Sequence, residues 1–131
     1  MRNLVVCSNG DESTDDSVRL AAAIAAGEGS VVAVSVLSGS LIDKSLPPAE
    51  AGRLRREAEN EAKERLASQA ERAAGDVDFH AVALFGDVVS DTLLVARNLG
   101  ADGVVMSADS PDLEELITEC PVPVVVIPRS R

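Results

Sequence analysis

The segment best suited to bind a phosphate follows the first apolar run of the chain. Residues 8–13 read Ser-Asn-Gly-Asp-Glu-Ser and stand between that run and a helix-like pattern. A turn in this position can direct backbone N–H groups at an anion, because the start of a helix carries partial positive charge. Four carboxylates lie in or just after the turn: Asp11, Glu12, Asp15 and Asp16. Each like-charge contact with a phosphate costs on the order of 1 kcal/mol or more, so the residues favour an Asn-Gly turn before a capped helix.

Residues 8–13 loosely resemble the Ser-Gly-Gly-x-Asp-Ser loop of the ATP pyrophosphatases, in which backbone N–H groups wrap a pyrophosphate. Asn9 and Glu12 depart from that pattern. The resemblance implies, as one alternative, an enzyme that uses the Ser8–Ser13 loop. The surrounding carboxylates argue against this alternative.

The other reactive side chains form no catalytic or metal-binding pattern. His80 is the single histidine and lies in the middle of a strand-like run, where we expect a structural role. Cys7 is expected to be a small buried apolar residue of the first strand. Cys120 precedes a proline at a helix end and has no basic neighbour in sequence that would activate it. We therefore predict no enzyme activity, no catalytic residue, no metal site and no resident cofactor.

The apolar residues alternate along the chain between strand-like runs and helix-like periods. Apolar runs predict five strands, at residues 4–7, 31–37, 77–84, 103–106 and 122–127. One helix is predicted between each pair of consecutive strands: after a cap at Ser13 or Thr14, from Pro48 to about residue 74, from Asp87 to residue 99, and from Pro111 to about residue 119. This alternation predicts a single domain over residues 1–131, a three-layer α/β/α sandwich with a Rossmann-like, doubly wound parallel sheet. We expect the strand order 3-2-1-4-5.

Ligands of such a sheet bind at the carboxyl ends of the strands, where the winding direction reverses. The candidate ligand-binding residues therefore follow the first, second and fourth strands. They are Asn9, Gly10, Leu37, Ser38, Met106, Ser107 and Ser110.

Several stretches, taken in chain order, resemble the universal stress protein family. Residues 3–10 are similar to the family's first strand, which ends in Asp-Gly where this chain has Asn-Gly. Residues 86–87 and 99–106 are similar to the limits of its third helix and to its fourth strand. Residues 121–128, Pro-Val-Pro-Val-Val-Val-Ile-Pro, are similar to its closing strand. The match covers nearly the whole chain.

The resemblance implies a homodimer and, in one branch of the family, ATP binding at a Gly-x2-Gly-x9-Gly-Ser loop directly after the fourth strand. Residues 106–112 here read Met-Ser-Ala-Asp-Ser-Pro-Asp, and no glycine follows Gly103. The phosphate loop is missing, and Asp109 and Asp112 make the remaining turn less favourable for a phosphate. We therefore expect ATP binding to be absent or weak. The alternative is an adenine-nucleotide binder that uses Asn9, the Leu37 backbone and the Ser107 turn.

The last predicted strand is apolar and falls at a sheet edge. Its residues are Val122, Val124, Val125, Val126 and Ile127. An uncovered apolar edge strand tends to associate with another strand, and pairing around a two-fold axis would cover it. This predicts a homodimer through the last strand, with a covered edge on a monomer as the alternative.

Charge and composition restrict the partners and the compartment. The 131 residues include 12 Lys and Arg against 22 Asp and Glu, a formal net charge of −10. This charge disfavours nucleic acid and anionic membranes, because both are polyanions. The chain shows no membrane span, signal peptide or disulfide framework, so we expect a cytoplasmic protein. The acidic surface suits either a high-salt cytoplasm or an ordinary acidic bacterial protein. Together with the resemblance to the universal stress protein family, which implies a role in the stress response, these features predict a dimeric, non-catalytic regulatory or binding module. They leave its protein partner open.

Overall fold

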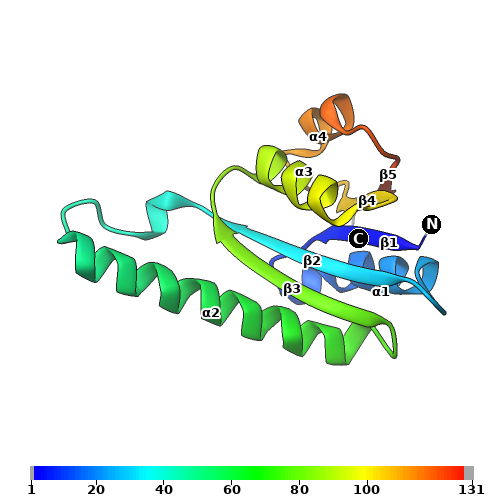
Figure 1. Ribbon diagram of the computed structural model, residues 1–131, viewed down its shortest axis with the longest axis horizontal. Helices are drawn as coiled ribbons and strands as arrows, with labels where there is room; N and C mark the ends of the chain where they lie inside the picture. Colours follow the sequence, from blue (N-terminus) through cyan, green and yellow to red (C-terminus); the bar gives the residue numbers. More distant parts are fainter. Residues whose placement is uncertain (1, 129–131) are drawn as a thin grey trace.

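Strands and helices alternate along the whole of the computed structural model, which describes residues 2–128 (Figure 1). The elements are β1 Asn3–Cys7, α1 Asp15–Ile24, β2 Ser30–Leu37, α2 Pro48–Ala73, β3 Asp78–Phe85, α3 Val88–Leu99, β4 Gly103–Ser107, α4 Leu113–Glu119 and β5 Val124–Ile127. Two short 3-10 helices lie in the loops, η1 at Glu12–Thr14 and η2 at Gly39–Leu41.

The five strands form one parallel sheet in the order β3-β2-β1-β4-β5. The predicted fold class and strand order are therefore confirmed. The chain moves outward from β1 through β2 to β3, then crosses back to β4 on the other side of β1. The winding direction consequently reverses between β1 and β4, which places a switch point at the carboxyl ends of these strands.

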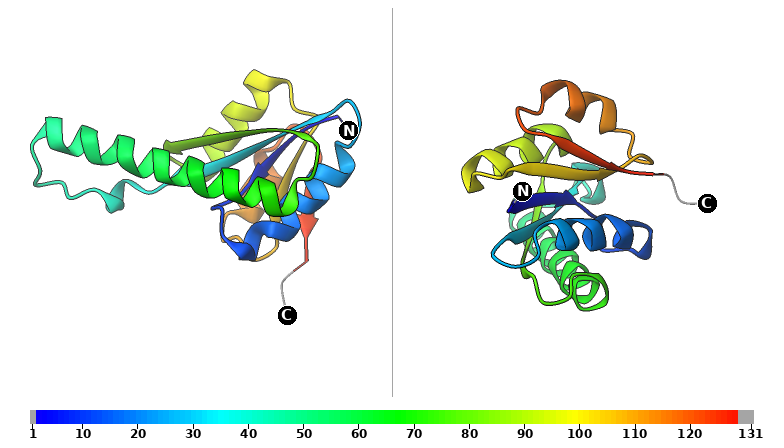
Figure 2. Two further views of the ribbon diagram at one scale, coloured as in Figure 1. Left: turned by 90° about the horizontal axis from the view of Figure 1, so that it is seen from below. Right: turned by 90° about the vertical axis from the view of Figure 1, so that its right-hand side faces the viewer.

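Helices cover both faces of the sheet, with α1 and α2 on one face and α3 and α4 on the other (Figure 2). Successive β1 residues point to opposite faces: Leu4 and Val6 pack with α1 and α2, whereas Val5 packs with α3 and α4. All three are almost completely buried. This two-sided burial explains why the first strand is continuously apolar.

Helix α2 is the longest element and extends beyond the sheet at its amino-terminal end (Figure 1). It begins at Pro48, directly after Pro47, and its last turn is followed by Gly75 at φ +62°. Both limits agree with the prediction, because proline suits the first helical position and glycine tolerates the left-handed conformation after the end. Its buried stripe includes Ala62 and Leu66.

At three places the structure differs from the prediction by more than one residue or in a predicted cap. Helix α4 begins at Leu113 rather than Pro111, because the Ser107 and Ser110 side chains hold the preceding residues in turns. Strand β5 begins after Pro123, so Val122 lies outside it. Thr14 precedes α1 as predicted, but its side chain makes no capping hydrogen bond to the helix.

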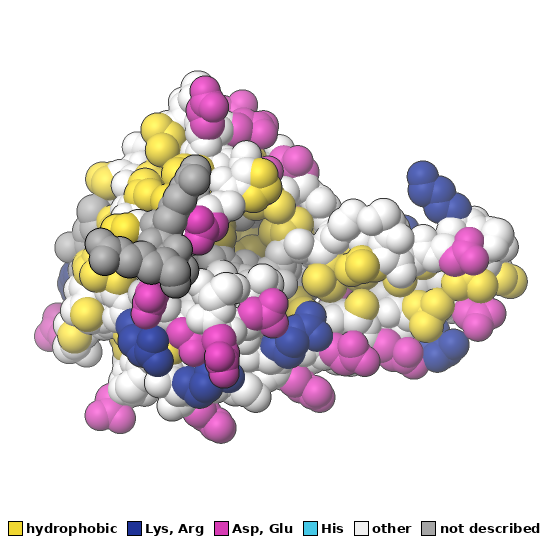
Figure 3. All heavy atoms as spheres, turned by 180° about the vertical axis from the view of Figure 1, so that it is seen from behind, with side chains coloured by type: hydrophobic (Ala, Val, Ile, Leu, Met, Phe, Trp, Pro, Cys, Tyr) yellow, Lys and Arg dark blue, Asp and Glu magenta, His cyan; other side chains and the backbone are white. Residues whose placement is uncertain are grey.

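Carboxylate side chains are spread over the visible face of the molecule and outnumber the cationic ones there (Figure 3). This distribution agrees with the net charge of −10. Among residues 2–128, none of the helices has both the length and the apolar character needed to cross a bilayer.

Candidate functional site

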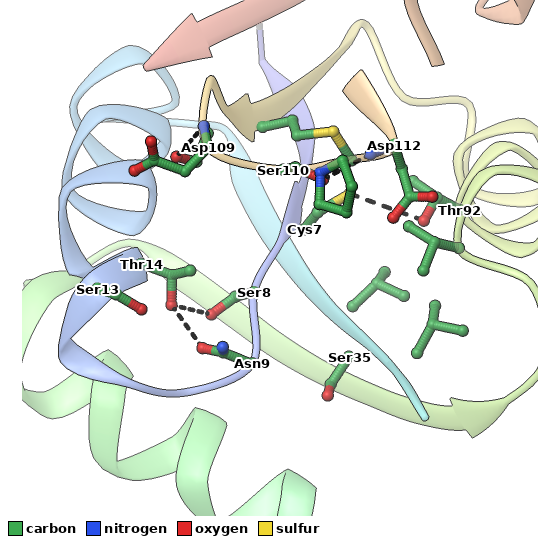
Figure 4. Close-up of a pocket in the computed structure, with 16 residues that line it drawn as sticks. Cys7, Ser8, Asn9, Ser13, Thr14, Ser35, Thr92, Asp109, Ser110 and Asp112 are labelled. Atoms are coloured by element: carbon green, nitrogen blue, oxygen red, sulfur yellow. Dashed lines mark hydrogen bonds between the residues drawn. The ribbon is translucent and has the colours of Figure 1, made fainter. Parts of the chain in front are cut away.

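A cavity of about 350 Å³ opens at the switch point, beside the carboxyl ends of β1, β2 and β4 (Figure 4). We call it the switch-point cavity. Its walls come from the turn after β1, the end of β2, two residues of α3, and the β4–α4 segment, residues 108–112. This is the place where doubly wound sheets bind ligands.

Asn9 occupies the turn after β1 and is already engaged in hydrogen bonds. Its side-chain carbonyl accepts from the Asp11 N–H at 2.9 Å and from the Thr14 hydroxyl at 3.2 Å. The Gly10 N–H donates to the Ser8 hydroxyl oxygen at 3.1 Å. Because the N–H groups of residues 10 and 11 donate to side chains of their own turn, they are not available to bind an anion.

A buried polar cluster fixes this turn to α2. Gln69, at 0% exposure, accepts a 2.5 Å hydrogen bond from Ser8. Its side-chain amide donates to Thr14 at 2.9 Å and to the Asp11 carbonyl and Asp15 carboxylate at 3.0 Å. Gln69 therefore ties the turn after β1 to α2.

Arg72, one turn further along α2, completes this cluster. Its guanidinium donates to Asp15 at 3.0 and 3.2 Å and to the Gly10 carbonyl at 3.2 Å. The hydrogen bonds from Arg72, and then those from Gln69, lower the pKa of Asp15 despite its burial. Asp15 is therefore a structural anion at neutral pH.

The β4–α4 segment uses its backbone donors internally. Ala108 N–H donates to the Ile127 carbonyl at 2.8 Å, and Ser110 N–H to the Ser107 carbonyl at 3.1 Å. Asp109 N–H and Asp112 N–H donate to the hydroxyls of Ser107 and Ser110, at 3.1 and 3.2 Å. Residue 111 is a proline and has no N–H. Each backbone N–H of residues 108–112 thus already has an acceptor within the protein.

Cys7 and Thr92 lie on the α3 side of the cavity, with Sγ and Oγ1 at 3.7 Å. Burial raises the pKa of Cys7 to about 11, and the negative charge of Asp112 adds to this effect. Cys7 is therefore a thiol at neutral pH. The residue is of intermediate exposure and not fully buried as predicted.

The structure brings four of the predicted ligand residues to the cavity wall: Asn9, Met106, Ser107 and Ser110. The other three lie elsewhere. Gly10, at φ +83°, faces α2, where an added Cβ would come within 2.7 Å of the Arg65 Cβ.

Leu37 and Ser38 lie further along β2 than the residues that reach the cavity. The Leu37 carbonyl accepts from the Gly86 N–H at 3.2 Å. Ser38 caps η2 by accepting from the Ser40 N–H at 3.2 Å. His80, expected to be structural, is exposed on β3 and lies 3.1 Å from an oxygen of Asp78.

Sequence reasoning did not find the cavity residues that come from β2 and α3, or the α2 anchor. Ser35 and Thr92 stand inside apolar elements, away from the predicted turns. Gln69 had a usable signal, because it lies seven residues after Ala62 and three after Leu66 and therefore shares their inward face. A polar residue on an apolar helix face indicates a buried hydrogen-bonding partner.

The predicted interface residues lie at or near the β5 edge of the sheet. Val126 is 39% exposed, whereas Ile127 is buried against the α1 face. Val125 packs partly on the same side, and Val122 and Val124 pack partly against the α4 side.

The chain belongs to the universal stress protein family, whose family model matches residues 1–128. A comparison of the sequence with characterised proteins gives no significant match.

Solved structures share the fold at low sequence identity. The hypothetical protein MJ0577 superposes with a TM-score of 0.82 at 14% identity, over 99% of this chain and 97% of that one. A universal stress protein in complex with cAMP gives 0.71 at 16% identity, over 98% of both chains. The universal stress protein from Archaeoglobus fulgidus in complex with dAMP gives 0.65 at 17% identity, over 97% of both. At these identities the likeness establishes the fold.

Proposed function

We propose that this protein is a non-catalytic, dimeric binding module of the cytoplasmic stress response that binds ATP weakly or not at all. The observation that carries this proposal is the internal use of every backbone N–H in residues 108–112. A phosphate group at this position would have to break those hydrogen bonds before it gained any. It would also approach the carboxylates of Asp109 and Asp112, which line the same wall.

The size of the effect follows from the value of each donor. A backbone N–H bonded to a charged phosphate contributes about 1.5–3 kcal/mol, so three missing donors remove about 5–9 kcal/mol if they are additive. Micromolar binding corresponds to about −8 kcal/mol. The remaining affinity for a triphosphate is therefore millimolar or weaker.

An adenine-nucleotide binder remains the alternative function. Two relatives of the same fold were crystallised with cAMP and with dAMP. Of the three groups predicted for that role, Asn9 and Ser107 line one cavity, whereas Leu37 lies outside it. This alternative uses the nucleoside part of the ligand and gains little from its phosphates.

An enzyme of the pyrophosphatase type is disfavoured by the surroundings of Ser8. Its hydroxyl is bonded to Gln69 at 2.5 Å, and the residue is only 7% exposed. We expect no release of pyrophosphate from ATP with magnesium, and the same background for the wild type and Ser8→Ala. Release that Ser8→Ala abolishes would contradict the proposal.

The dimer part of the proposal rests on the geometry of β5. The Pro123 carbonyl accepts from the Val104 N–H of β4 at 3.0 Å, and the Ile127 carbonyl accepts from the N–H of Ala108, the residue after β4, at 2.8 Å. Because backbone groups alternate in direction along a strand, the N–H and C=O of Val124 and Val126 face away from β4. Val126→Pro removes one outward donor and leaves the β4–β5 hydrogen bonds intact. It should convert a dimer to a monomer in light scattering, whereas Val126→Ala should stay dimeric.

Native mass spectrometry of freshly purified protein tests the whole proposal in one measurement. We expect two copies of the 13.6 kDa chain and no retained ATP. A single 13.6 kDa species would contradict the dimer. A species with bound ATP would contradict the proposed weak binding.

A further inference from the structure

Helix α2 is longer than the sheet that it covers, so its first turns lie beyond the strands (Figure 1). Its 26 residues span about 39 Å, whereas the eight residues of β3 span about 26 Å. Ala62 and Leu66, on the inward stripe of the helix, are 0% exposed. Ala51 and Leu54 continue this stripe toward the start of the helix and are only partly buried. We call residues 38–58, which comprise the β2–α2 loop and the first turns of α2, the arm.

The arm exposes apolar surface. A hollow of about 450 Å³, separate from the switch-point cavity, lies between the loop and α2, and its apolar lining is Ile42, Leu46 and Ala51. Leu41, the residue before Ile42, is 62% exposed, more than any other large apolar side chain in the described part of the chain. Figure 3 shows apolar side chains along this extension, between charged ones. The volume of the hollow lies within the range of known ligand pockets, so it can receive apolar side chains of a partner.

The arm is also the cationic part of an acidic protein. It holds four of the 12 Lys and Arg but only three of the 22 Asp and Glu, so the rest of the chain carries eight cations against 19 anions, a net charge of −11. Glu50 and Glu57 both bind the guanidinium of Arg53, at 3.4 and 2.7 Å. The carboxylate of Asp43 accepts from the N–H and the hydroxyl of Ser45 at 2.9 and 2.7 Å. Each acid of the arm therefore already has a partner within the arm.

The other three cations of the arm are exposed and have no such partner. Lys44 and Arg55 line the hollow, and Arg56 follows at the next position of α2. Within residues 2–128 none of the three forms an ion pair or a side-chain hydrogen bond. Arg55 lies over the ring of Phe85, with its guanidinium carbon 5.8 Å from the ring centre. A guanidinium stacked in this way keeps its N–H groups available to a carboxylate.

We propose that the arm binds an acidic segment of a partner protein, in which carboxylates flank one or two large apolar side chains. The apolar side chains enter the hollow against Ile42 and Leu46, and the carboxylates pair with Lys44, Arg55 and Arg56. This inference rests on the proposed function, because it names the partner class of the proposed binding module. The net charge of −11 on the rest of the chain repels an extended polyanion such as nucleic acid or a membrane, whereas a short segment contacts the arm alone.

A labelled peptide tests the proposal in fluorescence anisotropy titrations of the whole protein near neutral pH. The probe has the sequence Glu-Glu-Leu-Phe-Glu-Glu with fluorescein at its amino end, and we expect a dissociation constant in the micromolar range. A second peptide has Ala-Ala in place of Leu-Phe, and a third has Lys in place of each Glu. Each should bind at least about tenfold more weakly, because the first loses the apolar contacts and the second reverses the charges.

Reversal of the two cations of the hollow tests the electrostatic part. The double variant Lys44→Glu, Arg55→Glu should bind the probe about tenfold more weakly or worse, because an exposed ion pair contributes up to about fivefold and reversal adds repulsion. Lys63→Glu combined with Arg97→Glu is the matched control, since it reverses two exposed cations outside the arm and gives the same net charge. The control should change the affinity by less than about twofold. Urea unfolding shows whether both variants are folded.

Replacement of Leu41 tests the apolar part with a side chain whose exposure makes a folding defect improbable to arise from its loss. Leu41→Ser should weaken probe binding by about threefold to tenfold, because it removes apolar surface beside the hollow. Leu94→Ser is the matched control, since Leu94 is 49% exposed on α3. It should leave the affinity unchanged.

Three peptide results would overturn this inference: no binding of the probe at millimolar concentration, equal binding of the Lys peptide, or equal binding by the arm variants and their controls. Two other occupants would also overturn it. A second copy in the arm would give a mass above the dimer in sedimentation that Lys44→Glu, Arg55→Glu removes. A membrane would give co-sedimentation with vesicles of phosphatidylserine and phosphatidylcholine that the same variant abolishes. Subunit number through β5 and ATP affinity do not depend on the arm, so these results refute the partner class and leave the proposed function to its own tests.

Discussion

Replacement of Gln69 tests how far the wall of the cavity depends on α2. Gln69→Leu keeps an uncharged side chain of similar length and removes the hydrogen bonds to Ser8, Asp11, Thr14 and Asp15. Neutral hydrogen bonds contribute about 1 kcal/mol each and a bond to a carboxylate about 2 kcal/mol, so we expect a loss of about 3–5 kcal/mol. That is a large part of the 5–15 kcal/mol, roughly, by which a domain is stable.

Urea unfolding measures this loss as a lower midpoint with an unchanged slope. Asn60→Leu is the matched control, because Asn60 is an exposed amide on the same helix. The control should change the free energy of unfolding by less than about 0.5 kcal/mol. If Gln69→Leu were as stable as Asn60→Leu, the buried cluster would not hold the turn after β1, and our description of the cavity wall would be wrong.

Three further predictions concern groups whose environment the structure defines. The pKa of Asp15 is lower in the folded protein than its value of about 3.9 in an unfolded chain. The stabilising effect of the Asp15 carboxylate is therefore complete above its unfolded pKa and is lost as the pH falls through its folded pKa. On acidification the free energy of unfolding should fall less in Asp15→Asn than in the wild type, and an equal fall would refute the assignment. Cys7, with a pKa of about 11, should react with iodoacetamide far more slowly near neutral pH than it does after unfolding. Peptide mass spectrometry can measure both rates. Fast labelling of the folded protein would contradict the burial of the Cys7 thiol. Ser17 has a buried hydroxyl without a hydrogen-bond partner in residues 2–128, so Ser17→Ala should unfold at the same or a higher urea concentration, and a loss above about 1 kcal/mol would point to a missed partner.

The sequence was sufficient to predict the order of the elements, because each signal was local. A buried parallel strand is continuously apolar, as at residues 31–37, and a glycine such as Gly75 marks a helix end through its positive φ. The right-handed crossover rule and the alternation favour a doubly wound sheet, but by themselves they do not distinguish the order 3-2-1-4-5 from 2-1-3-4-5.

The site was only partly predictable, because its residues come from elements far apart in the sequence. The turns after β1 and β4 could be identified, and both line the cavity. Thr92 could not be identified, since a threonine within an apolar helix gives no sign of which strand end it will face. Leu37 was predicted to bind the ligand but lies too far along β2 to reach the cavity, because β2 extends beyond the end of β1. Cys7, the last residue of β1, pairs with Val34.

A calorimetric titration of the purified protein with ATP and magnesium tests the central claim most directly. The claim is that the backbone N–H groups of residues 108–112 already donate to acceptors within the protein and are not available to a phosphate. We expect a dissociation constant in the millimolar range or no measurable heat. A dissociation constant in the low micromolar range would contradict the account.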